Sequence, residues 1–377
     1  MFDVILLMAG ASKRLNLGIN KNLVEVLKKP IFMYSLETFL KVEGCNQIYV
    51  VCRDFEEEVV SKYLEGYSKV KVVIGGEERQ DSLYNGLKCV KSPYVLVHDA
   101  ARPNITKELI KEIVNIIKED VVASLAVKSK DTIKEVEDGY ITKNLVRKKL
   151  WAMQTPQGGP TKIYKEAFEK AIEEKFNATD DTEILMVYGK GKVIIVDASY
   201  NNYKITTQED LQAFIREKTM YKIGHSKDIH QLVENRPLIL GGINIPHSKG
   251  LLGHSDADCV LHSVAEAIIG ALGKGDIGKM FPDSDVKYKG IASSYFISEV
   301  KTLMDKEGYV INNLDLIIYL EKPILKDYKD SIKENIAKLL DCDSALINIK
   351  ATRNETLDAI GREEGIASEC VVMLVKK

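Results

Sequence analysis

The chain has 377 residues, of which 45% are hydrophobic and 29% are charged. This composition is ordinary for a globular protein, and at roughly 100–200 residues per domain the length predicts two domains. The formal net charge of -2 excludes a global basic field, so we expect no binding to nucleic acid or to a membrane surface. The six cysteines form no CxxC pair, and no apolar run is long enough to span a bilayer. The sequence therefore predicts a soluble, cytoplasmic protein.

The first 200 residues alternate short valine- and isoleucine-rich runs with amphipathic segments. This alternation is typical of βαβ units and predicts a mostly parallel sheet. The predicted strands are residues 3–7, 48–52, 70–74, 94–97, 121–127 and 192–196. A charged helix is predicted over 207–218, with Thr206 or Thr207 as its N-cap, and a new strand starts at 220–223. We therefore expect two domains, residues 1–215 and 220–377.

A loop of small residues follows the first predicted strand. It contains Ala9 and Gly10, and two cations follow at Arg14 and Lys21. Small residues let the backbone approach a ligand, and free N–H groups before a helix suit phosphate. Two cations beside such a loop can hold a triphosphate and stabilise charge on its phosphorus. On this loop alone, a strand–turn–helix with surface basic residues is an equal alternative.

Two further groups of polar residues follow predicted strands. Gly76, Glu77 and Ser82 come after the strand at 70–74, and Asp99 and Arg102 come after the strand at 94–97. In open α/β sheets, ligands bind at the carboxyl ends of the strands. The sequence therefore predicts base and phosphate contacts here. The alternative is that Asp99 caps a helix and Arg102 forms a surface ion pair.

With these motifs in order, residues 1–210 resemble the 2-C-methyl-D-erythritol 4-phosphate cytidylyltransferases. Other matching motifs lie at 150–157, 179–181 and 202–206. The resemblance implies a Rossmann-like nucleotidyltransferase sheet with a dimerisation arm. It also implies transfer of CMP from CTP to methylerythritol phosphate with Mg²⁺ offsetting the triphosphate charge.

The same resemblance assigns roles to single residues. The substrate loop would include Ala9 and Gly10, and the pentavalent phosphorus would be stabilised by Arg14 and Lys21. Cytidine would be held by Gly76, Glu77 and Ser82. Methylerythritol phosphate would be held by Asp99, Arg102, Thr179 and Lys204. Two residues in the dimer arm would act across a subunit interface, namely Thr132 and Arg147. One departure is Ser12, where the family usually has glycine.

Histidines concentrate in the second half of the chain, where five of the six fall between positions 225 and 262. Asp228 and His230 alternate in a predicted extended segment, so their side chains point to one side. A helix is predicted over 256–270, with Ser255 or Asp256 as its cap, and it places His262 against that segment. One carboxylate and two imidazoles leave a coordination position open, which is typical of catalytic zinc. The alternative is ordinary core or surface histidines.

Phosphate-type features follow this histidine cluster. A glycine-punctuated polar loop covers residues 275–285, and a strand predicted at 345–349 leads into Thr352, Arg353 and Glu355. A hard oxygen ligand such as Glu355 suits Mg²⁺ or Mn²⁺ better than zinc. The alternative for Glu355 is a surface acid without a ligand.

Residues 220–377 resemble the 2-C-methyl-D-erythritol 2,4-cyclodiphosphate synthases throughout, from Asp228-x-His230 to the motif at 361–367. The resemblance implies an α+β domain that trimerises. It also implies cyclisation of CDP-methylerythritol 2-phosphate to 2-C-methyl-D-erythritol 2,4-cyclodiphosphate, with release of CMP.

This resemblance also assigns site residues. Zinc would be held by Asp228, His230 and His262. Substrate phosphate would contact His254 and Ser255, ribose would contact Asp276 and Gly278, and methylerythritol would contact Asp283. The transition state would be steadied by Thr352 and Arg353, a second Mg²⁺ or Mn²⁺ would be held by Glu355, and the central cavity of the trimer would be lined by Ala359 and Arg362. Two departures are Arg353, where many members have threonine, and Ile324, where some have lysine.

Together the two resemblances imply a bifunctional enzyme of the methylerythritol phosphate pathway to isoprenoids. A dimeric half fused to a trimeric half predicts a homo-hexamer. One alternative is a nucleotidyltransferase for another sugar or polyol phosphate joined to a zinc phosphohydrolase. Another is a nucleotide- or metal-binding scaffold without activity.

Overall fold

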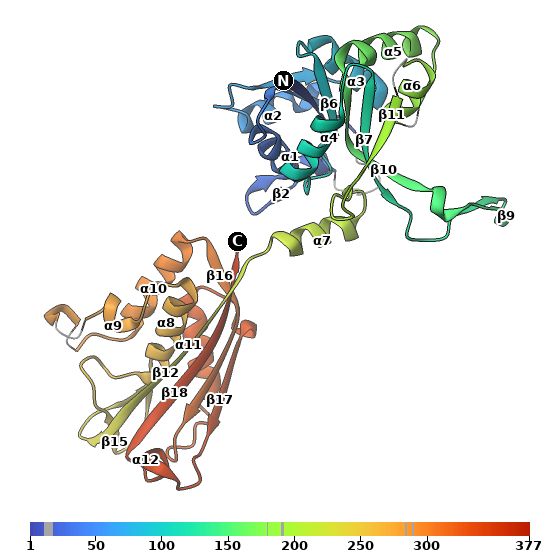
Figure 1. Cartoon of the computed structure of the whole chain (residues 1–377). Helices are drawn as coiled ribbons and strands as arrows, with labels where there is room; N and C mark the ends of the chain where they lie inside the picture. Colours follow the sequence, from blue (N-terminus) through green and yellow to red (C-terminus); the bar gives the residue numbers. More distant parts are fainter. Residues whose placement is uncertain (11–17, 179, 190–191, 283–284, 289) are drawn as a thin grey trace. The chain divides into compact units, whose positions relative to one another are not determined.

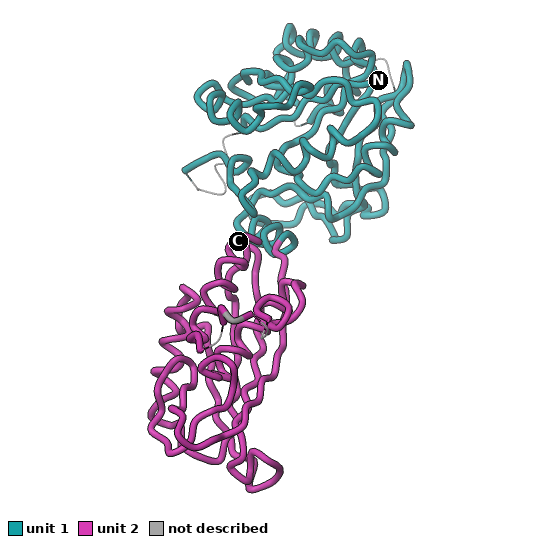
Figure 2. Tube along the Cα trace, turned by 90° about the vertical axis from the view of Figure 1, so that its left-hand side faces the viewer, with its two compact units in different colours: residues 1–218 teal, residues 219–377 magenta. Residues whose placement is uncertain are grey.

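The computed structural model describes residues 1–377 except for 11–17, 179, 190–191, 283–284 and 289. The chain forms two compact units, Met1–Lys218 and Thr219–Lys377 (Figure 2). We call them the N-terminal unit and the C-terminal unit. Each has its own main sheet and its own apolar core.

The N-terminal unit is built on a seven-stranded sheet with the order β11-β7-β10-β6-β1-β4-β5 (Figure 1). Its strands are β1 (Phe2–Leu7), β4 (Cys45–Cys52), β5 (Val70–Ile74), β6 (Tyr94–Asp99), β7 (Val121–Lys128), β10 (Trp151–Pro160) and β11 (Lys192–Asp197). Each strand predicted in this unit falls on one of these strands. The prediction of a mostly parallel sheet is confirmed, because only β10 runs antiparallel to its neighbours β6 and β7. Strand β10 was not predicted from the sequence, because Gly158, Gly159 and Pro160 have low strand propensity.

Helices cover both faces of this sheet. Alternate residues of β1 enter different cores, Val4 and Leu6 on one face and Ile5 and Leu7 on the other. A strand buried on both faces is expected at the centre of a parallel sheet. One face packs against α1 (Ile31–Leu40), α2 (Glu57–Tyr63) and α4 (Lys107–Ile116). The other packs against α3 (Arg79–Cys89), α5 (Thr161–Glu173) and α6 (Asp181–Val187).

Smaller elements complete this unit. A hairpin of β8 (Lys134–Glu137) and β9 (Tyr140–Asn144) extends away from the sheet as an arm, and its strand residues are exposed (Figure 1). The unit ends with α7 (Gln208–Lys218), where the Thr207 hydroxyl accepts a hydrogen bond from the backbone N–H of Asp210. The remaining short elements are β2 (Glu25–Val26), β3 (Lys29–Pro30), η1 (Lys21–Leu23), η2 (Asp54–Glu56) and η3 (Arg147–Lys149).

The C-terminal unit contains a five-stranded sheet with the order β15-β12-β18-β16-β17. Its strands are β12 (Tyr221–Glu234), β15 (Lys249–Leu251), β16 (Tyr309–Tyr319), β17 (Ile347–Thr352) and β18 (Gly365–Lys376). The core lies between this sheet and three helices, α8 (Cys259–Leu272), α10 (Ser294–Lys306) and α11 (Lys329–Leu340). The unit also has a hairpin and short helical turns, namely β13 (Leu238–Leu240), β14 (Ile243–Ile245), α9 (Ile277–Met280), α12 (Asp358–Gly361), η4 (Val286–Tyr288) and η5 (Ser344–Leu346).

Two predicted boundaries in this unit were wrong. Helix α8 begins at Cys259, and its cap is Asp258, whose carboxylate accepts from the N–H groups of Val260 and Leu261. Ser255 and Asp256 cannot cap it, because Ala257 has a φ of 59° and breaks the helical path. The strand predicted at 345–349 begins instead at Ile347, because the 3-10 turn η5 occupies the preceding residues.

None of the helices in the described part of the chain is long and apolar enough to cross a membrane.

Candidate active sites

Three predicted metal ligands come together in the C-terminal unit. Asp228 Oδ2 lies 3.1 Å from His230 Nε2 and 3.1 Å from His262 Nδ1. The two ring nitrogens are 3.4 Å apart, and one ligand atom from each residue lies within 4.8 Å of the others. One carboxylate and two imidazoles converging in this way fit a divalent metal with an open position for substrate.

The packing of α8 on β12 explains this convergence. Alternation along β12 points Asp228 and His230 toward the helix. Gly224 stands where the helix crosses the strand, and any Cβ there would collide with the carbonyl oxygen of Ala267. The missing side chain lets α8 approach closely, so His262 reaches the two residues on the strand.

The ionisation of the cluster suits a cation. Burial opposes a charge on Asp228, but hydrogen bonds from His230 and His262 outweigh it and lower the pKa of the carboxyl group. Burial also opposes a charge on His230, but its bond to Asp228 raises the pKa of the ring above its ordinary value. A metal ion would replace these shared protons. His230 Nδ1 lies 2.9 Å from the carbonyl oxygen of Leu252, which leaves Nε2 for the metal.

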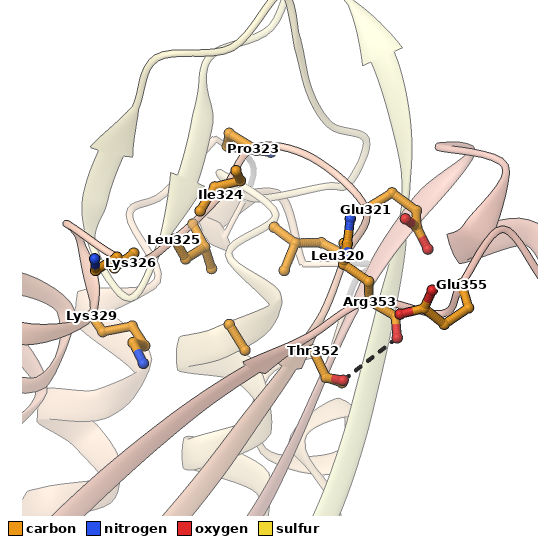
Figure 3. Close-up of a pocket in the computed structure, with 11 residues that line it drawn as sticks. Leu320, Glu321, Pro323, Ile324, Leu325, Lys326, Lys329, Thr352, Arg353 and Glu355 are labelled. Carbon is orange, nitrogen blue, oxygen red and sulfur yellow. Dashed lines mark hydrogen bonds between the residues drawn. The ribbon is translucent and has the colours of Figure 1, made fainter.

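A cavity of about 530 Å³ opens beside β17, an edge strand of the same sheet. Figure 3 shows Lys326 and Lys329 on one side of it and Glu321, Arg353 and Glu355 on the other. The other lining residues are apolar or short, namely Leu320, Pro323, Ile324, Leu325, Ala351 and Thr352. A partly apolar cavity with cations and carboxylates at its sides can accept a base together with its phosphates.

The backbone beside this cavity adopts an uncommon conformation. Glu355, Thr356 and Asp358 have φ values of 50°, 63° and 56°, each costing roughly 1 kcal/mol for a residue other than glycine. Gly361 packs directly on the backbone of Thr356, where a Cβ would collide. Strain held in place by close packing often marks a functional loop.

The metal cluster and the cavity lie in one row across the sheet. Asp228 on β12 pairs with Ser368 on β18, which pairs with Ile318 on β16. Ile318 in turn pairs with Ala351 on β17, a residue of the cavity. Three strand spacings of about 4.8 Å separate them by roughly 14 Å. The two groups of predicted site residues therefore do not meet within one chain.

The other predicted residues of this unit are scattered. Ser255 Oγ lies 3.2 Å from His262 Nε2, at the metal cluster, and His254 beside it is exposed. Asp276 caps the short helix α9, accepting from the N–H of Lys279, and Gly278 lies within that helix. Ala359 and Arg362 lie in and after α12. Asp283 lies outside the described residues.

In the N-terminal unit, cations converge on the buried Asp99 at the end of β6. Its carboxylate lies 2.7 Å from Lys204 Nζ, 3.5 Å from Arg79 Nη2 and 4.0 Å from Arg102 Nε. Burial alone would favour the neutral acid, but Arg79, Lys204 and Arg102 hold the pKa of Asp99 far below its ordinary value. Arg79 also forms a close ion pair with the buried Asp181.

Neighbouring side chains fix this group in place. The guanidinium of Arg102 donates to the carbonyl oxygens of Asn202 and Met153 at 2.9 Å and 3.3 Å. Burial lowers the pKa of His98 to about 4, so its neutral ring bridges Thr155 and the carbonyl oxygen of Arg102. Both alternatives from the sequence are therefore wrong, since Asp99 caps no helix and Arg102 is not at the surface.

The loops after β1 and β5 lie side by side. The backbone N–H of Gly76 donates to Ser82 Oγ at 3.1 Å, and a Cβ on Gly75 would lie 2.9 Å from that of Ala9. Gly10 and Glu77 are exposed beside them. The structure thus brings the two predicted loops together. Lys21 opens the short helix η1.

The remaining predicted residues of this unit are elsewhere. Thr132 is exposed just before the arm, and Arg147 lies just after it in η3, donating to the carbonyl oxygen of Lys130. Arg14, Thr179 and the departure at Ser12 lie outside the described residues.

Sequence reasoning gave no role to several residues that the structure places at these sites. Arg79 and Asp181 occur in the motifs at 75–82 and 179–181, but nothing in their spacing showed that they pair with each other. Lys326 and Lys329 follow no recognisable motif. Ser293, which contacts His262, is 31 residues away from it in the sequence and offered no signal.

Comparison with known proteins gives matches to both units. The family model of 2-C-methyl-D-erythritol 4-phosphate cytidylyltransferase matches residues 2–216, and that of the YgbB family matches residues 221–375. The bifunctional enzyme IspD/IspF of Pelagibacter ubique is 36% identical over 375 residues, covering 99% of this chain and 98% of that protein. The enzyme of the same name from Desulforudis audaxviator is 37% identical over 381 residues, covering 98% and 96%.

A solved structure matches the N-terminal unit. It is 4-diphosphocytidyl-2C-methyl-D-erythritol synthase from Anaerococcus prevotii, with a TM-score of 0.52 and 29% sequence identity. The match covers 58% of this chain and 95% of that one.

Proposed function

Because the chain belongs to the family of bifunctional IspD/IspF enzymes, we propose how its residues carry two reactions of the methylerythritol phosphate pathway. The N-terminal unit is a cytidylyltransferase and the C-terminal unit is a cyclodiphosphate synthase. In the first reaction, a phosphate oxygen of methylerythritol phosphate attacks the α-phosphorus of CTP, and pyrophosphate leaves. In the second, the 2-phosphate of CDP-methylerythritol 2-phosphate attacks the β-phosphorus, and CMP leaves.

In the N-terminal unit, the cationic group around Asp99 binds methylerythritol phosphate. Three cations, Arg79, Arg102 and Lys204, face two carboxylates, Asp99 and Asp181, so the group keeps an excess of positive charge for a phosphate. Within the described residues, the buried Nε of Arg102 has no hydrogen-bond acceptor, which supports its use by substrate. The neighbouring loops at Ala9 and Gly76 hold CTP, with Lys21 and Arg14 stabilising charge on the phosphorus.

In the C-terminal unit, Asp228, His230 and His262 hold a zinc ion. The observation that carries this proposal is their convergence on one point with the geometry of a three-ligand site. When bound, zinc would orient the diphosphate and withdraw charge from it. Glu355 at the cavity rim holds Mg²⁺ or Mn²⁺, and Thr352 and Arg353 bind the phosphates of the same substrate.

Two subunits build each cyclisation site. A distance of roughly 14 Å separates the metal cluster from the cavity within one chain, so a neighbouring copy would bring its cavity to the cluster. The C-terminal unit would therefore act as a trimer, and the exposed arm would pair N-terminal units as dimers. A closed assembly that uses both the trimer contact and the dimer contact contains six chains.

The cyclisation is tested by phosphorus NMR of purified protein supplied with Zn²⁺, Mg²⁺ and CDP-methylerythritol 2-phosphate. Wild type should form the cyclic diphosphate and CMP, and Asp228→Ala should form neither and should lose stoichiometric zinc. His247→Ala is the matched control, because this histidine bonds locally to Lys249 outside the cluster. Hydrolysis without cyclisation in wild type would contradict the proposal.

The cytidylyl transfer is tested separately by pyrophosphate release from CTP and methylerythritol phosphate. Lys204→Ala should lower kcat/KM by at least about a hundredfold, because it removes a charge-assisted contact at the substrate phosphate. Asp228→Ala should retain full transfer activity, since its site lies in the other unit.

A further inference from the structure

The imidazole of His262 has a partner at each nitrogen. Nδ1 lies 3.1 Å from Asp228 Oδ2, on the side of the metal cluster, and Nε2 lies 2.9 Å from Ser293 Oγ. Ser293 is fully buried and directly precedes α10. The ring is also held edge-on by Phe296, with centroids 5.6 Å apart. Its orientation therefore depends on elements that follow α8 in the sequence.

Ser293 is in turn held by Asp256. The backbone N–H of Ser293 donates to Asp256 Oδ2 at 2.9 Å, and its hydroxyl makes a short contact with Asp256 Oδ1. An ionised carboxylate can only accept hydrogen bonds, so the hydroxyl proton of Ser293 points toward Asp256. A lone pair of the same oxygen then faces His262 and can accept a hydrogen bond from its Nε2–H.

This chain of bonds selects one form of the ring. A histidine that donates from Nε2 carries its lone pair on Nδ1, and Nδ1 is the atom that faces Asp228 and His230. We infer that Asp256 and Ser293 are positioning residues, which fix the tautomer and orientation of His262 for metal binding. This inference rests on the metal site proposed above and adds two residues that support one of its ligands.

The other histidine of the cluster is fixed differently. His230 Nδ1 bonds to the backbone carbonyl of Leu252, an acceptor that no side-chain substitution removes. Ser255 Oγ also approaches His262 Nε2, at 3.2 Å, but it accepts the N–H of Ala257 as well. The shorter bond to Ser293 and its anchoring by Asp256 make Ser293 the acceptor that sets the ring.

The test is the zinc affinity of the full-length protein, measured by competition with a chelator. Ser293→Ala and Asp256→Asn should each bind zinc about 10- to 100-fold more weakly than wild type, the usual effect of losing such a partner. Ser263→Ala is the matched control. This serine is next to His262 on α8 and equally buried, but it bonds to Val260 and Ser368, so its loss should leave zinc affinity unchanged.

A spectroscopic measurement separates positioning from general damage. In zinc-loaded wild type, nitrogen-15 NMR should show the His262 Nε2–H protected from solvent exchange, and Ser293→Ala should lose this protection. Circular dichroism of the zinc-free variants checks their folding, and Asp256→Asn, which keeps the side-chain shape, remains informative if Ser293→Ala unfolds.

Three outcomes would overturn the inference. Wild-type zinc affinity and a protected Nε2–H in both folded variants would show that the ring does not depend on this pair. Loss of protection in Ser255→Ala, with none in Ser293→Ala, would assign the role to Ser255. A wild-type protein that binds no stoichiometric zinc would remove the proposed metal site itself, and this inference with it.

Discussion

At the residue scale, the balance of charge around Asp99 decides how the N-terminal site behaves. A carboxylate that is buried and still ionised must be offset by cations. Here Lys204, Arg79 and Arg102 supply them from three separate segments of the chain. Removal of the carboxylate would leave those cations facing one another.

We predict that Asp99→Asn destabilises the N-terminal unit by about 3 kcal/mol at pH 7. This value is at the lower end for breaking a buried ion pair, because the side chains of Arg79 and Lys204 are about one third exposed. Folding lowers the pKa of Asp99, so its carboxylate stabilises the folded unit fully at pH values above its ordinary pKa near 3.8. This stabilisation is lost as the pH falls below that value. The difference in unfolding free energy between wild type and Asp99→Asn should therefore be constant above about pH 5 and become smaller in more acid solution.

The measurement is urea unfolding followed by fluorescence of Trp151, the single tryptophan of the chain, which lies on β10 in this unit. Exposed Asp120→Asn is the control and should change stability by less than about 0.5 kcal/mol. A difference that stays the same down to pH 3 would show that Asp99 is not ionised through these cations.

At the element scale, the cap of α8 holds the metal-binding helix in place. Both oxygens of the buried Asp258 are used, because Gly241, Gly242, Val260 and Leu261 all donate their N–H groups to them. The carboxylate thus joins the start of α8 to the β13–β14 turn.

We predict that Asp258→Ala destabilises the C-terminal unit by at least about 3 kcal/mol, because three buried N–H groups and that of Gly242 lose their acceptor. Asp343→Ala is the matched control. This exposed residue caps the short turn η5 through a single N–H, so its loss should cost about 1 kcal/mol or less. Chemical unfolding of residues 219–377, followed by circular dichroism, gives the unfolding free energy of each variant. Equal losses of stability in the two variants would show that Asp258 contributes no more than an ordinary helix cap.

The arm of β8 and β9 is the second element with a clear consequence. Val136, Tyr140 and Ile141 are 56%, 78% and 67% exposed, which is unusual for apolar residues on a regular hairpin unless a partner covers them. Substitution of Tyr140 and Ile141 by aspartate should reduce the proposed hexamer to a trimer without unfolding the sheet. Light scattering measures the mass, Asp138→Asn at the hairpin tip is the control, and a persisting hexamer would assign the dimer contact elsewhere.

At the scale of the whole molecule, the separation of metal cluster and cavity predicts complementation between chains. Asp228→Ala and Glu355→Ala should each be inactive alone, but their co-expression should restore about a quarter of wild-type cyclisation. In randomly mixed trimers, about one interface in four combines an intact metal cluster from one chain with an intact cavity from its neighbour. Asp228→Ala with His262→Ala is the control and should restore none, since both changes affect the same half. Failure of the first pair would show that one chain supplies the whole site.

Much of this protein followed from the sequence by itself. Periodicity located six of the seven strands in the main sheet of the N-terminal unit, because a buried parallel strand needs a continuous run of β-branched residues. It missed the antiparallel strand β10. Motif order identified both families, since ligand chemistry restricts residue types such as Asp228-x-His230. The charged helix predicted over 207–218, followed by a new strand, also predicted a boundary between two domains near residues 215–220.

Only the tertiary structure decided which distant side chains share a site. Arg79 meets Asp181 across 102 residues, and Ser293 meets His262 across 31. Such contacts depend on how helices pack on a sheet, for example where Gly224 lets α8 approach β12 closely. A local sequence pattern does not predict them. Strand pairing likewise placed the metal cluster on β12 and the cavity of the same chain beside β17, three strands away. The residue types of each segment determine its local chemistry, whereas tertiary packing determines which functional side chains come into contact.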